Sequence, residues 1–230
     1  MRIVESGFEF EHPVDGAEIL RQIERAGRTC YKSEAKITAD SAITFVAKII
    51  NSGHESVLEH EKITVRVICD RGVSHEIVRH RIASYSQEST RYCDYAKSGD
   101  IQVIEPQAWF FKSQFSRREW EEAMRDAERH YNALRQYGES PQIARSVLPQ
   151  SLKTEIVMTM NLREWRHFFR LRTSPAAHPQ MRTLALSMLQ EFCRLIPVVF
   201  DDIRVERKCI DGEVGTRAVL NRLRELGEGA

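Results

Sequence analysis

Apolar residues recur along the first part of the chain at the spacing of an α-helix. Leu20, Ile23 and Ala26 follow one another at helical intervals. A second helix is predicted from a cap at Thr38 to Gly53, because the apolar residues between them again follow helical spacing. Two helices are therefore expected ahead of the first segment that carries candidate chemistry.

The pattern changes to alternation over Lys62–Cys69, where every second residue is apolar. This alternation predicts a half-buried β-strand. We expect the Arg71-Gly72 pair to turn the chain after this strand. Ser74 is then predicted to cap a short helix that runs through Val78 to Ile82.

Helical spacing returns in the second half of the chain. A capping box formed by Ser116 and Glu119 predicts the start of a long helix that ends near Gly138. The Ser140-Pro141 pair predicts the start of another helix, because serine is a favoured cap and proline a favoured first helical residue. Pro149 is expected to close it.

The last part of the chain is predicted to contain one strand and two helices. The strand is expected at Glu155–Met160, the helices at Asn161–Arg172 and Met181–Leu195. The charged stretch 212–230 is expected to form a peripheral helix that frays. Because strands and helices mix without a regular βαβ alternation, the fold class is predicted to be α+β, with a mixed or antiparallel sheet flanked by helices. A single domain is expected over residues 1–230.

Composition narrows the class of protein. The 230 residues are 42% hydrophobic, which is enough for a substantial core. The net charge of +1 gives no global field that would hold a nucleic acid or an anionic membrane. The amino terminus lacks the apolar region of a signal peptide, and no stretch is long enough to span a bilayer. The expected location is therefore cytoplasmic.

The cysteines and histidines indicate neither a disulfide framework nor a metal site. The five cysteines are scattered and never form a Cys-x-x-Cys pair, so reduced structural thiols are expected. His54 and His60 flank two glutamates, but their spacing fits no standard zinc motif. No metal is predicted.

The densest candidate chemistry lies between Arg79 and Arg91, where three guanidiniums, an imidazole and three serine hydroxyls occur together. Guanidiniums are fixed-charge forks that suit phosphates and planar acceptors, so an anionic ligand is expected. On a helix, Arg79 and Arg81 would point to opposite sides, about 200° apart, and this corner would reach two ligands. Ser89 has no visible general base, which favours a hydrogen-bonding role over a nucleophilic one. A solvated basic turn is the alternative for the Arg-His-Arg triplet alone.

Three further blocks carry polar residues at suggestive spacing. His54–His60 contains two histidines, a serine and two glutamates, and is otherwise a polar helix start. Arg145–Pro149 has an arginine ahead of a Leu-Pro pair, and Arg145 alone is a cation at a helix end. In the predicted Asn161–Arg172 helix, Arg163 and His167 are i, i+4 neighbours. Its buried side is expected to consist of Trp165, Phe168 and Leu171. A solvated stripe is the alternative for the arginines there.

Together these four blocks resemble the flavin-dependent thymidylate synthases. A serine follows eight residues after Arg81 and an arginine two residues further on, as in that family's motif. The other blocks fall in the family's order, and the resemblance extends from His54 to Arg182. It implies reductive methylation of dUMP to dTMP, with FAD as cofactor, NADPH as reductant and methylenetetrahydrofolate as carbon donor. It also implies a homotetramer with active sites at subunit interfaces.

The resemblance assigns expected roles to individual residues. Those expected to bind FAD are His54, Ser56, Glu59, Arg79, His80, Arg81, Gln87, Asn161, Leu162, Arg163 and His167. Those expected to bind dUMP are Glu76, Ile77, Val78, Arg79, Gln87, Glu88, Ser89, Thr90, Arg91, Arg145 and Arg172. Arg172 is expected to hold the uracil and help ionise its N3, and is the predicted catalytic residue. Gln87, His167 and the His178–Arg182 segment depart from the family pattern. The neutral amide at Gln87 weakens any acid–base role but keeps hydrogen bonds.

Other classes of site remain to be weighed. No Gly-x-Gly-x-x-Gly fingerprint follows a predicted strand, which argues against a Rossmann site for FAD or NADPH. An RNA- or nucleotide-binding module would use the arginines of Arg79–Arg91 for phosphates, and for base stacking Tyr85, Tyr92 and Tyr95. The balanced net charge argues against it. A cysteine-dependent thymidylate synthase needs a nucleophilic thiol, for which Cys93 is the nearest candidate.

Overall fold

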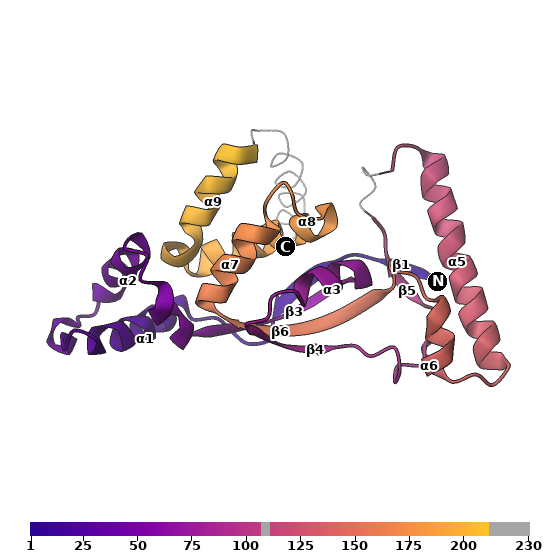
Figure 1. Ribbon diagram of the computed structural model, residues 1–230, viewed down its shortest axis with the longest axis horizontal. Helices are drawn as coiled ribbons and strands as arrows, with labels where there is room; N and C mark the ends of the chain where they lie inside the picture. The colour runs from indigo at the N-terminus through magenta and orange to yellow at the C-terminus, as the bar shows by residue number, and fades with distance from the viewer. Residues whose placement is uncertain (107–110, 212–230) are drawn as a thin grey trace. The chain divides into compact units, whose positions relative to one another are not determined.

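The computed structural model describes residues 1–106 and 111–211 of the chain (Figure 1). These residues form two compact units. Unit 1 contains Met1–Glu11 and Val65–Met158, and unit 2 contains His12–Thr64 and the described residues from Thr159 onward. The prediction of one domain over the whole chain is not decided by this division and stays a prediction. No helix in the described ranges combines the length and the apolar character needed to cross a bilayer.

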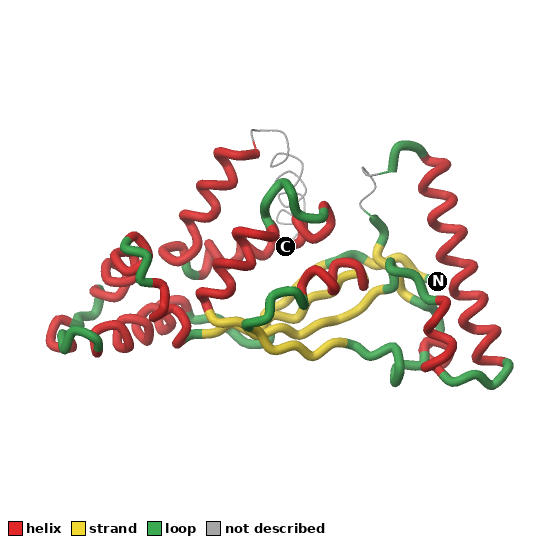
Figure 2. Tube along the Cα trace, viewed as in Figure 1, coloured by secondary structure: helices red, strands yellow, loops and turns green. Residues whose placement is uncertain are grey.

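The larger of two sheets has four strands in the order β2-β3-β6-β4. These strands are β2 (Gly7–Phe10), β3 (Lys62–Asp70), β4 (Ala83–Gln87) and β6 (Lys153–Asn161). β2 runs antiparallel to β3. The smaller sheet pairs β1 (Arg2–Val4) in parallel with β5 (Gln102–Ile104) (Figure 2). The combination of helices with an antiparallel strand pair and without a regular βαβ alternation confirms the predicted α+β class.

Side chains alternate between buried and half-exposed along the two long strands. The buried rows are Ile63, Val65, Val67 and Cys69 in β3, and Thr154, Ile156, Met158 and Met160 in β6. The predicted strand at Lys62–Cys69 is therefore confirmed with the expected buried face. β6 is longer than the predicted Glu155–Met160, because Thr154 continues the buried row at its start.

The residues after β3 form a helix, α3 (Arg71–Ile77), so the predicted turn at Arg71-Gly72 is wrong. The cap is Asp70, whose Oδ1 accepts a hydrogen bond from the Val73 N–H at 2.7 Å. Ser74, the predicted cap, lies inside the helix and donates its hydroxyl to the Arg71 carbonyl. An aspartate at the end of a strand satisfies the free N–H groups of the first turn as well as a serine does.

The predicted extension of this helix through Ile82 is also wrong. α3 ends at Ile77, and the Tyr85 hydroxyl donates to the carbonyls of Ile77 at 2.9 Å and His80 at 2.7 Å. These bonds hold the chain in a turn, and Ala83 begins β4 where a loop was expected. Arg79 and Arg81 are therefore not on a helix, and the argument from helical rotation does not apply to them.

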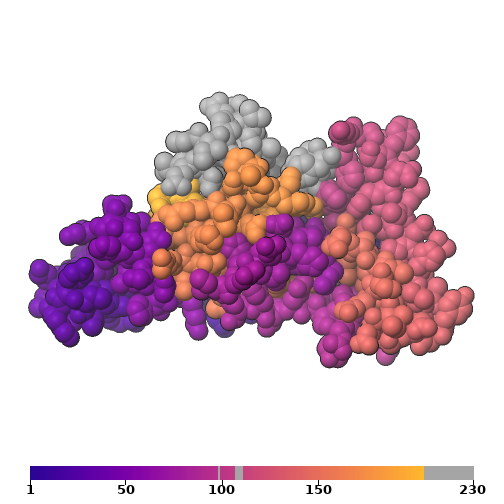
Figure 3. Space-filling model, viewed as in Figure 1, coloured from indigo at the N-terminus to yellow at the C-terminus, as the bar shows by residue number. Residues whose placement is uncertain are grey.

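Unit 1 is completed by α4 (Tyr95–Ser98), α5 (Gln114–Gln136), α6 (Pro141–Ala144) and the short 3-10 helix η4 (Arg145–Val147). The cap of α5 is Ser113 and not Ser116, since the Ser113 Oγ accepts from the Ser116 N–H at 3.1 Å. α6 begins at Pro141 as predicted. α5 and α6 pack together, and their side chains form one continuous block in the space-filling view (Figure 3). A small apolar core lies beneath them, formed by Ile101, Val103, Met124 and Leu152.

Unit 2 is mostly helical. Its elements are α1 (Gly16–Thr29), η1 (Glu34–Lys36), α2 (Ser41–Asn51), η2 (Glu55–His60), α7 (Leu162–Arg172), α8 (Pro179–Leu195) and α9 (Pro197–Asp211). The helices predicted at α1, α7 and α8 are confirmed. α2 begins at Ser41 and not at the predicted cap Thr38, because the Thr38 N–H donates to the Ser41 hydroxyl in the turn before the helix. α9 was not predicted, and the predicted helix over 212–230 lies outside the described residues.

An aromatic cluster forms the core of unit 2. The Trp165 ring lies 4.7 Å from that of Phe192 and 5.6 Å from that of Phe169, measured between centroids. The start of α1 and the end of α8 approach so closely that a Cβ on Gly16 would lie 2.1 Å from the Leu195 carbonyl oxygen. Leu171 is 49% exposed, so its predicted place on the buried side of α7 is wrong. Phe169 takes that place.

Candidate functional site

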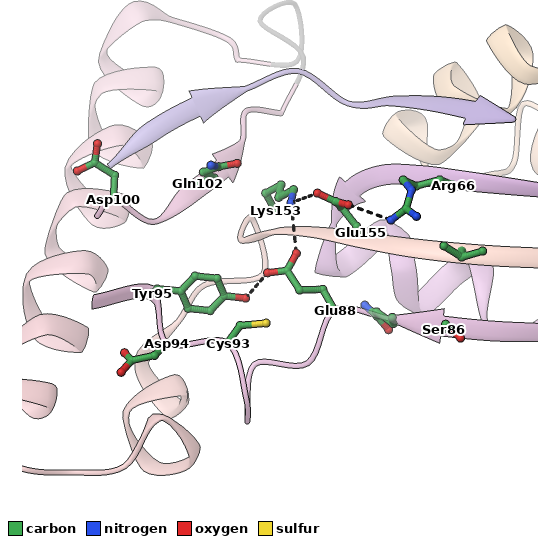
Figure 4. A pocket seen from close by; sticks show the side chains of 12 residues that line it. Arg66, Ser86, Glu88, Cys93, Asp94, Tyr95, Asp100, Gln102, Lys153 and Glu155 are labelled. Carbon is green, nitrogen blue, oxygen red and sulfur yellow. Dashed lines mark hydrogen bonds and ion pairs between the residues drawn. The ribbon is translucent and has the colours of Figure 1, made fainter. Parts of the chain in front are cut away.

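A pocket of about 660 Å³ opens on the half-exposed face of the sheet in unit 1. The side chains of β6 that line it are those left outside the buried row, Lys153, Glu155 and Val157. The rest of the lining is Arg66, Ser86, Gln87, Glu88, Cys93, Asp94, Tyr95, Asp100 and Gln102 (Figure 4). Of the predicted site residues, this pocket contains Gln87 and Glu88.

A chain of hydrogen bonds and ion pairs connects the side chains of the pocket wall. The Tyr95 hydroxyl donates to Glu88 Oε1 at 2.7 Å, and Lys153 Nζ donates to Glu88 Oε2 at 3.3 Å (Figure 4). Lys153 also binds Glu155, whose other oxygen lies 3.3 Å from Arg66. Both cations in this wall are therefore neutralised by carboxylates, so the wall does not present free positive charge to an anion.

The ionisation of these groups follows from their contacts. Burial disfavours the charged form of Lys153, but the hydrogen bond to Glu155 and the charge of Glu88 outweigh burial and raise the Lys153 pKa. The hydrogen bond from Lys153 lowers the pKa of Glu155 against a smaller effect of burial. Burial and the hydrogen bond to Glu88 raise the pKa of Tyr95. Tyr95 is thus a neutral donor, and Lys153 and Glu155 stay ionised at neutral pH.

A second cluster in unit 1 brings together residues more than fifty positions apart. Arg145 Nη1 donates to the Thr90 hydroxyl at 3.2 Å, and Arg91 Nε donates to Gln142 Oε1 at 3.0 Å. The Arg91 guanidinium also lies over the Tyr92 ring, 5.4 Å from its centroid. Neither Arg91 nor Arg145 forms an ion pair with a carboxylate of the described residues. Both predicted arginines therefore keep their charge for a ligand.

The turn that carries Thr90 and Arg91 begins at Ser89, which is also a predicted site residue. Its carbonyl accepts from the N–H groups of Tyr92 and Cys93, at 3.1 and 2.9 Å. Its hydroxyl accepts from the Arg91 N–H at 3.3 Å. The hydroxyl is thus engaged with a backbone amide, and the hydrogen-bonding role expected of Ser89 towards a ligand stays a prediction.

The Arg-His-Arg triplet divides into exposed and buried members. Arg79 and Arg81 are exposed, whereas His80 is only 3% exposed. In the helix ahead of it, Glu76 is half-buried, Ile77 is fully buried and Val78 is 39% exposed. Ile77 therefore packs in the core of unit 1. The ligand contacts expected of these residues stay predictions.

Gln87 is held inside unit 1 by two hydrogen bonds. Its Nε2 donates to Ser74 Oγ at 3.0 Å and to Thr154 Oγ1 at 3.2 Å. The amide group thus connects β4 to α3 and to β6. An ionised glutamate at this position could only accept hydrogen bonds, so the hydroxyls of Ser74 and Thr154 would both have to donate to it.

In unit 2, two predicted blocks that are about a hundred residues apart come together. Arg163 Nη1 binds Glu59 Oε1 at 2.5 Å, so the start of α7 faces η2. His54, Ser56 and His167 are exposed on the same two elements. The structure therefore brings the two predicted blocks into contact at Glu59 and Arg163.

The remaining predicted residues of unit 2 lie along α7. Asn161 caps this helix, with its Oδ1 accepting from the Glu164 N–H at 2.9 Å. Leu162 is fully buried, and its N–H donates to the Glu61 carbonyl. Arg172 is half-buried in the last helical turn.

Sequence reasoning missed the residues that hold η2 in place. Arg166 is 1% exposed, and its Nε donates to Glu55 Oε1 at 3.0 Å. Its Nη1 and Nη2 donate to Asp202 Oδ1 and Oδ2 at 2.9 and 2.6 Å. Burial alone would raise the pKa of Asp202. The hydrogen bond and the charge of Arg166 together lower this pKa by more than burial raises it, so the net shift is downward. Nothing in the sequence sets Asp202 apart from the aspartate before it.

The described thiols have no features of an activated nucleophile. Cys30, Cys69, Cys93 and Cys193 are free. Burial raises the pKa of Cys69 and of Cys193 to about 12. Cys93 lines the same pocket as Glu88.

Comparisons with known proteins agree with the motif order. The family model described as thymidylate synthase complementing protein matches residues 15–198. A flavin-dependent thymidylate synthase from Geobacter sulfurreducens is 38% identical over 184 residues, covering 77% of this chain and 78% of the relative. One from Mycobacterium marinum is 34% identical over 219 residues, covering 88% and 86%.

Among solved structures, the chain is similar to a UMP/dUMP methylase, PolB from Streptomyces cacaoi, crystallised with 5-Br dUMP. The TM-score is 0.72 at 22% sequence identity, over 89% of this chain and 97% of that one. At this identity the likeness concerns the fold.

Proposed function

Since the chain belongs to the flavin-dependent thymidylate synthase family, we propose that it reductively methylates dUMP to dTMP. The enzyme is then an FAD-dependent methyltransferase, with methylenetetrahydrofolate as carbon donor and NADPH as reductant. The proposal rests on family membership and on the clusters of cations in the two units.

The observation that carries the proposal is a pair of arginines at the Ser89–Cys93 turn, Arg91 within the turn and Arg145 of η4 bound to it through Thr90. Arg91 and Arg145 are held by the neutral groups of Gln142 and Thr90, so they are oriented without being neutralised. Two oriented guanidiniums suit the phosphate of a nucleotide. dUMP supplies that phosphate.

The other predicted substrate residues complete the nucleotide site. We assign binding of dUMP to the segment Glu76–Arg79, to the segment Gln87–Arg91 and to Arg145 and Arg172. Arg172 is the catalytic residue in this proposal. A fixed cation beside the uracil N3 stabilises negative charge that develops on the ring, which is worth roughly 3 kcal/mol for a well-placed donor.

The residues present fit an FAD molecule. Its diphosphate requires cations, and Arg79 and Arg81 are exposed guanidiniums without a carboxylate partner among the described residues. His54, Arg163 and His167 add exposed donors on unit 2. We assign FAD binding to these residues together with Ser56, Glu59, His80, Gln87, Asn161 and Leu162. When bound and reduced by NADPH, FAD supplies the hydride that completes the methyl group.

Assembly into a homotetramer is part of the proposal. The described residues include no phosphate-cradling glycine loop that would hold a dinucleotide locally. We therefore expect the exposed cations of several subunits to share each FAD.

Two rival functions are less well supported. An RNA-binding module would need three tyrosine faces, but the Tyr85 hydroxyl binds two backbone carbonyls and Tyr95 is hydrogen-bonded to Glu88. Only Tyr92 of the three is strongly exposed, at 79%. A cysteine-dependent synthase would need an activated thiol, and Cys93 lies beside a carboxylate.

An absorption spectrum and a product assay test the proposal. The purified protein is expected to be yellow, with a flavin band near about 450 nm. It should form dTMP from dUMP when NADPH and methylenetetrahydrofolate are supplied together, and not when either is left out. A colourless protein that neither binds added FAD nor forms dTMP would contradict the proposal.

A further inference from the structure

The turn Ser89–Cys93 is anchored at both ends by contacts outside it. Upstream, the Glu88 N–H donates to the Glu155 carbonyl at 2.9 Å, which fixes the end of β4 on β6. Downstream, Asp94 receives two hydrogen bonds from Arg135 of α5, at 3.1 and 2.7 Å. The Tyr95 N–H also donates to the Tyr131 hydroxyl at 3.2 Å. The two ends of the turn therefore rest on different elements.

One side-chain contact connects these two ends directly. The Tyr95 hydroxyl reaches back over the turn to Glu88 Oε1 at 2.7 Å, and Lys153 occupies Oε2 at 3.3 Å (Figure 4). The side chains of Glu88 and Lys153 are only 18% and 15% exposed. Both carboxylate oxygens of Glu88 are thus engaged within unit 1, in a partly desolvated setting where charge-assisted hydrogen bonds are strong.

We propose that Tyr95 and Lys153 are positioning residues that act through Glu88 to hold the Ser89–Cys93 turn in its nucleotide-binding form. This inference rests on the proposed function. Glu88, assigned above to dUMP with the rest of Gln87–Arg91, acts in this inference as a positioning residue instead, because Tyr95 and Lys153 engage both oxygens of its carboxylate. Its side chain closes the turn, so that Arg91 and Thr90 keep the positions that bring Arg91 and Arg145 to one phosphate.

The physical reason is preorganisation. A turn that is already closed does not lose conformational freedom when the nucleotide binds, so affinity is higher than for a mobile turn with the same contacts. Because the phosphate contacts are the same in the ground state and during reaction, a looser turn weakens dUMP binding more than it slows the bound complex.

Single substitutions test this role through dUMP affinity. Tyr95→Phe keeps the ring that packs edge-on against Tyr131 and removes only the hydroxyl. We expect the dissociation constant for dUMP to rise roughly tenfold, as for loss of a hydrogen bond to a charged group, with flavin content unchanged. Tyr137→Phe is the matched control, since Tyr137 is 85% exposed, and it should leave the constant unchanged.

A double-mutant cycle separates a shared role from direct contact with dUMP. Glu88→Leu removes the acceptor, so Tyr95→Phe in that background should weaken dUMP binding no further. It should even restore part of the affinity, because the Tyr95 hydroxyl would otherwise be left without its acceptor. If Tyr95→Phe costs the same factor with and without Glu88→Leu, the two residues act independently and the inference is wrong.

The same experiment distinguishes failure of the inference from failure of the proposed function. Wild-type protein that neither binds dUMP nor forms dTMP overturns both. Wild-type protein that is active while Tyr95→Phe binds dUMP normally, even with a lowered melting temperature, overturns the positioning role alone. A rise in the Michaelis constant with near-normal maximal turnover in Tyr95→Phe supports it.

Discussion

Arg163 and Arg166 are three positions apart on α7 and have opposite surroundings. The Arg163 side chain is 54% exposed and pairs with Glu59, whereas that of Arg166 is 1% exposed and is enclosed by Glu55 and Asp202. A buried guanidinium requires such partners, because a buried charge without a partner is unfavourable. Removing one partner of a buried ion pair typically lowers the stability of the fold by about 3–5 kcal/mol. Arg166 is therefore structural, and Arg163 is accessible to a ligand.

Arg172 is the residue whose substitution best tests the proposed chemistry. Arg172→Ala should keep FAD and allow NADPH to reduce it, yet weaken dUMP binding and lower dTMP formation by on the order of a hundredfold. Arg172→Lys should recover only part, because an ammonium lacks the planar fork. Stopped-flow flavin reduction and dUMP titration measure the two effects. Arg194→Ala on the exposed side of α8 is the control, and normal turnover in Arg172→Ala would remove Arg172 from the site.

The thiols provide a second prediction at the scale of single residues. Because no described cysteine has the setting of an activated nucleophile, replacing all five with serine or alanine should leave dTMP formation largely intact. The measurement is turnover of the folded, FAD-loaded variant. If activity were lost and then rescued by restoring Cys93 alone, a thiolate mechanism would replace the one proposed.

At the scale of elements, the contact of Arg166 with Asp202 ties α9 to α7, and its contact with Glu55 ties α7 to η2. η2 carries His54 at its start and Glu59 within it, both predicted to bind FAD. α9, which begins at the end of the family match, thus supports the segment that was predicted to bind FAD, although it carries no predicted ligand itself.

The ionisation of Asp202 gives a pH-dependent test of that support. Its folded pKa lies below the usual value of about 3.8. Its stabilising contribution is therefore complete above about pH 4 and is lost as pH falls through the lower folded value. Asp202→Asn should lower the melting temperature at pH 7, and the difference from wild type should shrink as the pH approaches 3.

Asp126→Asn is the matched control for this measurement. Asp126 lies on α5 with a 64% exposed side chain and, among the described residues, pairs with Arg129 in the next turn. Exposed pairs of this kind contribute little, so the control should change the melting temperature by little at either pH. A loss of stability in Asp202→Asn that is the same at pH 7 and pH 3 would contradict the role of the ion pair.

At the scale of the whole molecule, the proposed FAD site depends on assembly. The described residues of one subunit offer exposed cations but no glycine loop that would bind the diphosphate of FAD. We therefore expect FAD to be held only where cations from several subunits meet. Dilution below the assembly range should therefore release flavin, as followed by its fluorescence alongside light scattering. A stable monomer that retains one FAD per chain would rule out a shared site.

The sequence by itself determined the elements whose periodicity is strong and the order of the motifs. The alternation of Lys62–Cys69, the stripe of Met181–Leu195 and the block Asn161–Arg172 form the predicted strand and helices, because spacing reports which face of an element is buried, although Leu171 in the last block is exposed. The charged blocks also identified the family, since their residue types and intervals do not depend on knowing which side chains touch.

Tertiary structure alone decided which of many similar polar side chains meet. Asp70 rather than Ser74 caps α3, the Tyr85 hydroxyl binds carbonyls at the end of that helix, and Glu88 binds Tyr95 and Lys153. Arg166 is buried and Arg163 is not, although both are arginines on one helix. Periodicity is a local property of the chain, whereas the partner of a charge or a hydroxyl is fixed only when distant segments pack against it.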